Sequence, residues 1–230
     1  GETFDSIIGS SDEILEVKEK AMKVAKYIRE TVVIEGRTGT GKEHFAKAIH
    51  DSSMRGTKPF DVINCGAMNE ALFRSELFGY KAGSFTGAVK DTEGLLKKID
   101  GGTLFLDELS DLSLENQKDL LRFVEDGKVR PIGGSEPDIV KVDIRIICAS
   151  NKNLALEVRK GLFREDLFFR LNVFSITLPE LKDRKGDIKI LTDHFIDQLN
   201  LDFSVMEGFQ EKKLTPRALE TLEKHHWPGN

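Results

Sequence analysis

Between residues 12 and 29, apolar side chains recur every three or four positions, which predicts an amphipathic helix. The apolar positions are Ile14, Val17, Ala21, Val24 and Ile28. A short run rich in β-branched residues, 31–35, then predicts a strand, and residues 42–50 return to a helical pattern. A strand, a glycine-rich turn and a helix in this order are typical of half a βαβ unit.

Four further short runs have the length and composition of strands, and helical segments separate most of them. They are residues 60–65, 103–107, 143–149 and 173–178. Short apolar runs alternating with helices predict a parallel sheet that is covered on both faces. Residues 186–225 show helical patterns only, so we divide the chain into an α/β part, 1–182, and a small helical part, 183–230.

The overall composition indicates a soluble domain that does not bind nucleic acid through general basicity. The chain has 230 residues and a net charge of -5, so DNA contact would need a separate domain. No apolar run is long enough to span a membrane and the first residues do not resemble a signal peptide, so we expect a cytoplasmic protein without membrane contact. The two cysteines, Cys65 and Cys148, are expected to be buried thiols.

A glycine-rich segment directly follows the first predicted strand and opens the next helix. It fits the pattern G-x-x-x-x-G-K and consists of Gly36, Arg37, Thr38, Gly39, Thr40, Gly41 and Lys42. In this context the backbone N–H groups and the helix N-terminus would surround phosphates, and Lys42 would reach the terminal ones. Glu43 replaces the usual hydroxyl ligand of Mg²⁺. The alternative is a glycine-rich turn with a surface lysine.

Polar residues end three of the predicted strands. Asp107 and Glu108 follow the third, where the first acid would hold Mg²⁺ and the second would activate water. Asn64 ends the second strand and could orient Glu108, because the ends of parallel strands meet at one edge. Ser150 and Asn151 end the fourth and could reach the same phosphate. Ordinary helix capping is the alternative for these three polar residues, and spacing alone favours it.

Two arginines, Arg164 and Arg170, lie beside phenylalanines after the fourth strand. Surface ion pairs with Glu165 or Asp166 would explain them. Alternatively, their guanidinium groups would stabilise charge on a transferring phosphoryl group in a neighbouring subunit.

Residues 75–88 contain the segment that points to a known family. The central hexapeptide is Gly83, Ser84, Phe85, Thr86, Gly87 and Ala88. With Glu43 after the phosphate-loop lysine and Trp227-Pro228-Gly229-Asn230 near the end, the chain closely resembles the central AAA+ ATPase domain of sigma-54-dependent transcription activators. The resemblance covers essentially the whole chain.

This resemblance implies an AAA+ P-loop NTPase of the α/β class, with a five-stranded parallel sheet flanked by helices and a partial helical lid. It implies an ATPase that uses ATP and Mg²⁺, assembles into a ring, normally a hexamer, and remodels sigma-54 RNA polymerase holoenzyme through the hexapeptide loop for open-complex formation. Asn64 would be the switch for Glu108, and Ile8 and Gly9 would line the adenine pocket. A second surface loop would lie near residues 130–137, and the regulators concerned include those of two-component systems.

The sequence departs from the family pattern in the loop region. Ser84 replaces the usual alanine, Arg74 stands where an acidic residue is expected, and Tyr80-Lys81-Ala82 replaces a His-Glu-Lys-like segment. The resemblance also implies a lid arginine beyond Asn230. Two other readings stay open: an AAA+ machine acting on another client, and a nucleotide-gated binding module with little hydrolysis.

Overall fold

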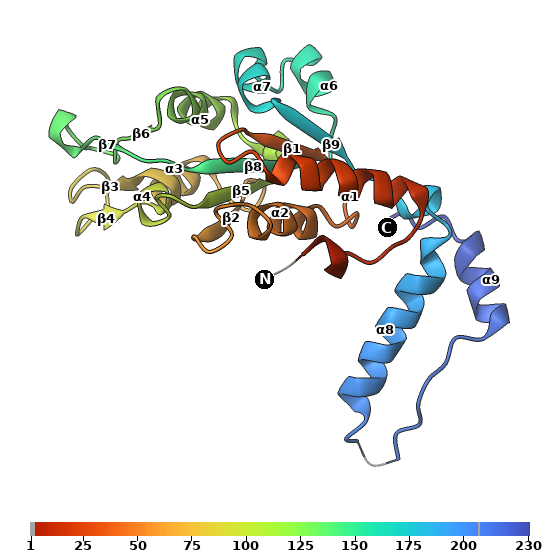
Figure 1. The fold of residues 1–230 in the computed structure, drawn as a ribbon. Coiled ribbons are helices and arrows are strands. Elements are labelled where there is room, and N and C mark those ends of the chain that lie inside the picture. Colours follow the sequence, from red (N-terminus) through yellow and green to blue (C-terminus); the bar gives the residue numbers. More distant parts are fainter. Residues whose placement is uncertain (1–2, 207) are drawn as a thin grey trace.

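Five parallel strands form the centre of the computed structural model, which describes residues 3–206 and 208–230 (Figure 1). In space their order is β2-β5-β8-β1-β9. The strands are β1 Val32–Glu35, β2 Phe60–Asn64, β5 Thr103–Asp107, β8 Arg145–Ser150 and β9 Phe174–Thr177. The predicted five-stranded parallel sheet is therefore confirmed.

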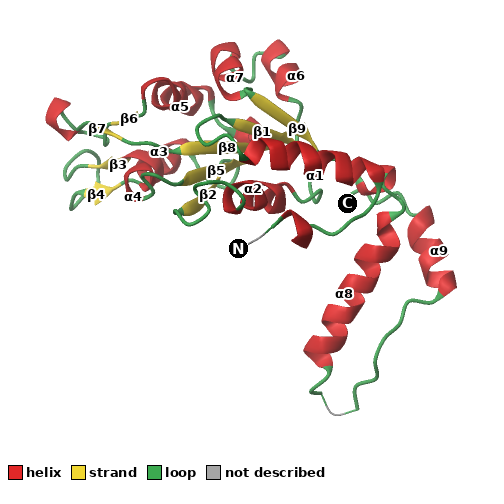
Figure 2. Cartoon of the chain, in the orientation of Figure 1, coloured by secondary structure: helices red, strands yellow, loops and turns green. Residues whose placement is uncertain are grey.

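Helices cover both faces of this sheet (Figure 2). One face packs on α1 Asp12–Ala25 and α2 Lys42–Asp51. The other packs on α3 Glu70–Phe78, α4 Leu95–Lys98, α5 Leu114–Asp126, α6 Leu154–Arg159 and α7 Glu165–Leu171. Successive residues of β5 alternate between the two cores, with Leu104 and Leu106 in one and Phe105 in the other. Burial on both faces explains why the strands are almost continuously apolar.

Helix α1 ends at Ala25, earlier than the predicted Arg29. The chain turns after this point, and the ring of Tyr27 packs at 4.9 Å from that of Phe174 on β9. Residues 26–30 thereby lead the chain into β1 rather than extending the helix.

The carboxyl ends of the strands meet at one edge of the sheet. Asn64 pairs in register with Asp107, and Glu35 pairs with Ser150. The phosphate loop leaves β1 at this same edge. The topology therefore brings the polar strand ends and the glycine-rich loop together, as expected for a parallel sheet.

Two small hairpins project from the α/β part on the side away from α8 (Figure 1). The first pairs β3 Gly79–Tyr80 with β4 Thr92–Glu93, and the second pairs β6 Lys128–Val129 with β7 Val140–Lys141. A bridge between Tyr80 and Ile132 joins them. Four short 3-10 helices complete the α/β part and its link to the extension: Phe4–Ser6, Leu109–Asp111, Glu136–Asp138 and Leu181–Asp183.

A helical extension follows the α/β part, made of α8 Asp187–Phe203 and α9 Pro216–Lys224. The two helices contact each other and project away from the sheet. The sequence predicted helices throughout this region, but residues 208–215 form no helix before Pro216. Within the described ranges, no helix has both the length and the apolar character needed to cross a membrane.

Candidate functional site

The phosphate loop connects β1 to α2 and has the backbone shape that its glycines predict. Gly39 and Gly41 adopt φ angles of 82° and 91°, in the left-handed region that favours glycine. Helix α2 begins at Lys42. The Lys42 Nζ atom donates hydrogen bonds to the carbonyl oxygens of Gly36, at 2.8 Å, and Arg37, at 3.2 Å. The lysine therefore lies across the concave side of its own loop.

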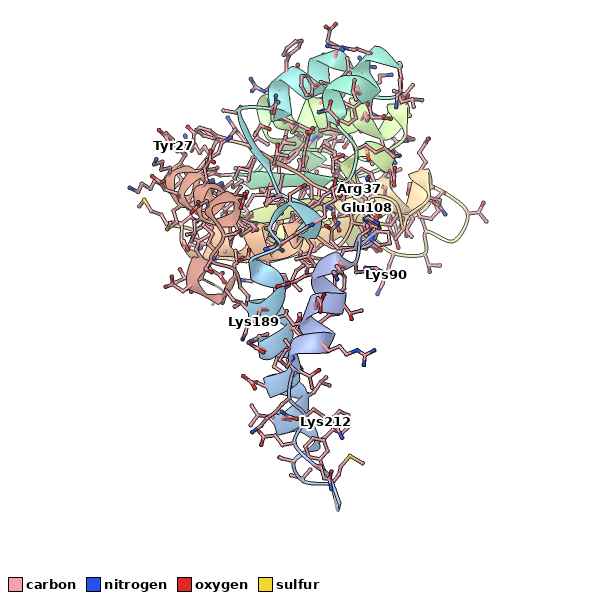
Figure 3. The ribbon with its side chains drawn as sticks, turned by 90° about the vertical axis from the view of Figure 1, so that its right-hand side faces the viewer. Tyr27, Arg37, Lys90, Glu108, Lys189 and Lys212 are labelled. Atoms are coloured by element: carbon pink, nitrogen blue, oxygen red, sulfur yellow. The ribbon has the colours of Figure 1, made fainter. Side chains whose placement is uncertain are left out.

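A cavity of about 330 Å³ lies beside this loop at the carboxyl edge of the sheet. Its lining residues are Thr38, Gly39, Gly41, Lys42, Glu43, His44, Asp107, Glu108 and Asn151. Figure 3 labels Arg37 of the loop and Glu108, which appear near each other in this view. Burial lowers the pKa of Lys42, and the nearby carboxylates of Asp107 and Glu108 oppose this shift. The arrangement combines the Lys42 ammonium, three acids including Glu43, and a helix N-terminus, which suits a phosphate group with a metal ion.

Glu108 occupies an unusual backbone conformation, with φ at 52°. Its N–H donates to Asp107 Oδ1 at 2.9 Å. A Cβ atom on Gly66 would lie only 2.6 Å from Glu108 Oε2 and 3.2 Å from Asp111 Oδ2. The Glu108 carboxylate therefore sits against the turn that follows β2, and a second acid lies next to it. A left-handed non-glycine residue at such a site is a form of stored backbone strain.

Asn64 lies at the same corner but does not bond to Glu108. Its Oδ1 atom accepts from the backbone N–H groups of Gly66, at 2.9 Å, and Ala67, at 3.0 Å. Asn64 thus stabilises the turn after β2 and is not the helix cap that spacing alone favoured, because the next helix starts at Glu70 and has Asn69 as its cap. The amide nevertheless lies beside Gly66, the residue against which Glu108 packs.

Ser150 and Asn151 differ in what they contact. Ser150 is buried, and its hydroxyl bonds to both the N–H and the carbonyl of Lys152, so it shapes the turn after β8. Asn151 lines the cavity, and its Oδ1 accepts from the Ser110 hydroxyl at 3.4 Å. Lys152 pairs with Asp111 at 2.7 Å, which ties the end of β8 to the segment after β5.

A second cavity, of about 500 Å³, lies on the other side of the phosphate loop. Ile7 and Ile8 line it together with Gly39, Thr40 and Gly41, while α8 and the C-terminal residues form the opposite wall. Ile8 therefore lines a cavity next to the phosphate loop, and its assignment to an adenine pocket stays a prediction. Gly9 is not among the lining residues; it packs behind this wall, against Asp187.

The two arginines line neither of these cavities: Arg164 precedes α7 as its N-cap residue, and Arg170 lies in its last turn. Arg164 forms a two-pronged ion pair with Asp166, with nitrogen–oxygen distances of 3.0 and 2.7 Å. The hydrogen bonds that Arg164 donates to the Asp166 carboxylate raise the pKa of Arg164 further. Arg170 is exposed and makes long contacts, at 3.4 Å, to the carbonyl oxygens of Val124 and Glu125. Within one chain these arginines do not reach the candidate site.

The hexapeptide forms the tip of the first hairpin. Gly83 and Gly87 adopt φ angles of 80° and 101°, and the Gly83 N–H donates to the Ala88 carbonyl at 2.8 Å. Phe85 remains 45% exposed although its ring packs edge-on at 4.9 Å from Tyr80. This partly exposed aromatic side chain offers apolar surface to a partner.

The second hairpin supports the first. Lys81 pairs with Asp91 at 3.0 Å and with Asp138 at 2.8 Å, so a single ammonium group links both hairpins. Ser84 packs against Gly133 so closely that a Cβ there would lie 2.6 Å from Ser84 Cβ. Arg74, the other departure from the expected pattern, pairs with Asp119 on α5 at 2.8 Å. These unusual residues therefore have local partners.

Several residues near the site were not singled out in the sequence. They are Gly66, Asp111, Lys152, Arg184 and Asp187. All but Arg184, which contacts Asp187 three residues away, contribute through a contact with a residue distant in the chain, and no local pattern marks such contacts. Among the described residues, no cluster of three or more His, Cys, Asp or Glu side chains is suited to a metal ion. A magnesium ion at Asp107 would therefore need phosphate or water ligands, as this ion commonly does.

The sequence matches two family models. Residues 7–177 match the sigma-54 interaction domain, and residues 182–230 match the AAA+ ATPase lid domain. The chain is 46% identical over 200 residues to the transcriptional regulatory protein ZraR of Escherichia coli, covering 87% of this chain and 44% of that protein. It is 42% identical over 227 residues to a Nif-specific regulatory protein of Sinorhizobium fredii, covering 99% of this chain and 37% of that protein. The chain thus spans less than half the length of these relatives.

Solved structures show the same fold. The structure of NtrX from Brucella abortus in complex with ATP matches with a TM-score of 0.86 and 34% identity, over 98% of this chain and 49% of that one. A structure of Hsp104 with casein matches with a TM-score of 0.65 at 18% identity over 97% of this chain and 42% of that one, a likeness of fold alone.

Proposed function

Because this chain belongs to the sigma-54 interaction domain family of AAA+ proteins, we propose that it is the ATP-hydrolysing module of a sigma-54-dependent transcription activator. The cavity that joins Lys42, Asp107, Glu108 and Asn151 is the observation that carries this proposal. We assign phosphate binding to an α/β subdomain, residues 1–182, and the lid to a helical subdomain, residues 183–230. The relative NtrX binds ATP, which supports nucleotide binding here.

ATP would bind with its phosphates on the N–H groups of residues 36–42. Lys42 would leave the loop carbonyls for the terminal phosphates, because an anion attracts the ammonium more strongly than neutral carbonyls do. Asp107 would hold Mg²⁺, which neutralises phosphate charge when bound. Glu43, which also lines the cavity, takes the position of the usual hydroxyl residue.

Hydrolysis would depend on four polar residues at the strand ends. Glu108 would accept a proton from the attacking water. Asn64 would switch from the N–H groups of residues 66 and 67 to the Glu108 carboxylate, which lies against the same turn. Asn151 would sense the terminal phosphate. Ser150 would contribute indirectly, through the turn that it shapes.

Arg164 and Arg170 would act on the site of a neighbouring subunit in a ring. We propose that this ring is a hexamer. Both lie at the ends of α7, away from the cavities of their own chain. The Asp166 carboxylate would hold Arg164 until phosphate oxygens of the neighbour replace it. A guanidinium supplied in this way stabilises the charge that develops during phosphoryl transfer.

The hexapeptide loop, residues 83–88, would contact sigma-54 in the polymerase holoenzyme and remodel it for open-complex formation. Phe85 supplies exposed apolar surface at the tip. Any DNA binding would belong to a separate domain.

A second candidate is an AAA+ machine with a different client. The replaced segment Tyr80-Lys81-Ala82 and the Ser84 side chain favour it, because both lie in the first hairpin and neither lines the nucleotide cavity.

Capture of purified sigma-54 tests the choice. The full-length protein that carries this domain is incubated with sigma-54, ADP and a metal fluoride that mimics the transferring phosphoryl group. Phe85→Ala serves as the matched control. Capture that needs both the analogue and Phe85 supports the sigma-54 function. ATPase activity without capture favours the second candidate.

A further inference from the structure

The wall of the larger cavity is built from segments at opposite ends of the chain. Residues 6–8 form one part, and Leu181, Arg184 and Ile188, around the start of α8, form another. The phosphate-loop residues 39–41 lie between them. A nucleotide whose phosphates bind that loop would place its base in this cavity.

Asp187 joins these two parts of the wall. Its side chain is fully buried, with an exposed fraction of 0%. Oδ1 accepts from the N–H groups of Ser10, at 2.7 Å, and Ser11, at 2.8 Å, while Oδ2 accepts from the Ser11 hydroxyl at 2.9 Å. The first turn of α8 is therefore bonded to the segment that starts α1. Hydrogen bonds to a buried carboxylate are among the stronger ones in proteins.

Gly9 makes this close approach possible. It adopts a φ of 141°, and a Cβ at this position would lie 2.7 Å from Asp187 Oδ2. On the other side, Lys18 of α1 donates to the carbonyl oxygens of Ile7 and Gly9. Burial lowers the pKa of Lys18, partly offset by the negative charge of Asp187. Residues 7–11 are thus held from α1 and from α8 together.

Arg184 gives this arrangement a direct connection to the cavity. Its side chain is 9% exposed, it lines the cavity, and its Nη1 lies 3.7 Å from Asp187 Oδ2. Its Nε is buried and has no hydrogen-bond partner among the described residues. A buried guanidinium keeps unused donors only at a cost, so a ligand with acceptor atoms would be favoured there.

We propose that Asp187 is a positioning residue that locks the base-pocket segment, residues 7–11, to the first turn of the lid helix and holds Arg184 at the cavity wall. The purine base of the nucleotide is then recognised jointly by both ends of the chain. This inference rests on the proposed nucleotide-binding function and adds to it the residues that select the base.

Base selectivity provides the test, because it separates the base pocket from the phosphate loop. The affinities for ATP and for CTP are measured by competition with a fluorescent ATP analogue, in the full-length protein. Asp187→Asn keeps an oxygen for the two N–H groups but loses the charge opposite Arg184. Ser11→Ala removes only the hydroxyl bond. Asp183→Asn, an exposed acid one turn earlier, is the control.

We expect Asp187→Asn to lower ATP affinity about tenfold while CTP affinity changes little, since the loss involves hydrogen bonds to a charged group. Ser11→Ala should shift the ATP-to-CTP ratio in the same direction by less, and it carries the test if Asp187→Asn does not fold. The control should keep the original ratio.

Three results would overturn the proposal in different ways. An unchanged ratio of ATP affinity to CTP affinity in both variants would show that the contacts of Asp187 with residues 10 and 11 do not shape the base pocket. Equal losses for ATP and CTP in folded variants would indicate a general structural role. Failure of the unaltered protein to bind either nucleotide would remove the proposed function itself, and with it this inference.

Discussion

At the scale of single residues, the candidate site assigns different tasks to neighbouring charges. Lys42 lies on the phosphate loop and Glu108 lies across the cavity, against the turn at Gly66. The first would bind phosphate, whereas the second would act only when water attacks. Substitutions at the two positions should therefore affect different steps.

Lys42→Ala is expected to abolish nucleotide binding, because it removes the cation at the phosphates. Glu108→Gln is expected to retain binding while turnover falls about 100-fold or more, the usual range for losing a general base. Equilibrium binding of a fluorescent ATP analogue and phosphate release measure the two effects. Normal turnover in either variant would contradict the assigned roles.

The two thiols should be unreactive in the folded protein. Burial raises the pKa of Cys65 to about 12 and that of Cys148 well above its usual value. Since the thiolate is the reactive form, little of it exists near neutral pH. A thiol reagent such as dithionitrobenzoate should label neither residue until the chain is unfolded in urea. Rapid labelling of the native protein would show that one strand end opens.

At the scale of elements, the two hairpins form one unit on the side away from the lid. The bridge from Tyr80 to Ile132 and the ion pairs of Lys81 cross between them. Hydrogen bonds that Lys81 donates to the carboxylates of Asp138 and, second in size, Asp91 raise the pKa of Lys81. The pairs are exposed, so they contribute little to overall stability. Their effect should instead be on how the loop is held.

Lys81→Ala should loosen the hexapeptide loop without harming the nucleotide site. We expect faster hydrogen exchange over residues 81–91, while melting temperature and ATPase rate stay close to those of the unaltered protein. Lys98→Ala, an exposed lysine on the nearby α4, is the matched control. Equal exchange in all three proteins would mean that the backbone bridge alone holds the loop.

At the scale of the whole molecule, the catalytic arrangement that we propose would be incomplete within one chain. Arg164 faces Asp166 on α7 rather than the cavity. A ring in which each chain supplies α7 to its neighbour would complete the site. Activity should then depend on assembly.

The ATPase rate per subunit should accordingly rise with protein concentration, and Arg164→Ala should lower it about 1,000-fold or more, the lower end for an arginine finger. Mixing Arg164→Ala with Glu108→Gln provides a sharper measurement. Each is nearly inactive alone, but a mixed ring contains sites with an intact Glu108 beside an intact Arg164. If mixing restores no activity, and if the rate per subunit does not change on dilution, the site is not shared between subunits.

The sequence by itself determined the strands, their parallel arrangement and the family. Each of the five central strands is a short apolar run. The helix after the phosphate loop follows from the spacing of its apolar residues and from the glycines before it. Both signals depend only on neighbours in the chain. The placement of Lys42, Asp107 and Glu108 in one cavity followed because parallel strands end at a common edge. Helix ends were less predictable, as the early stop of α1 shows, because tertiary packing of Tyr27 decided it.

Only the tertiary structure decided which partners the polar groups take. Asn64 bonds to its own turn, Arg164 bonds to Asp166, and Asp187 reaches back to Ser10 and Ser11 across almost the entire chain. Such contacts leave no periodic signal, because any of several nearby donors or acceptors satisfies the same side chain. The physical reason is that hydrogen-bond pairing depends on distance in space, whereas a pattern along the chain records only which face of an element is buried.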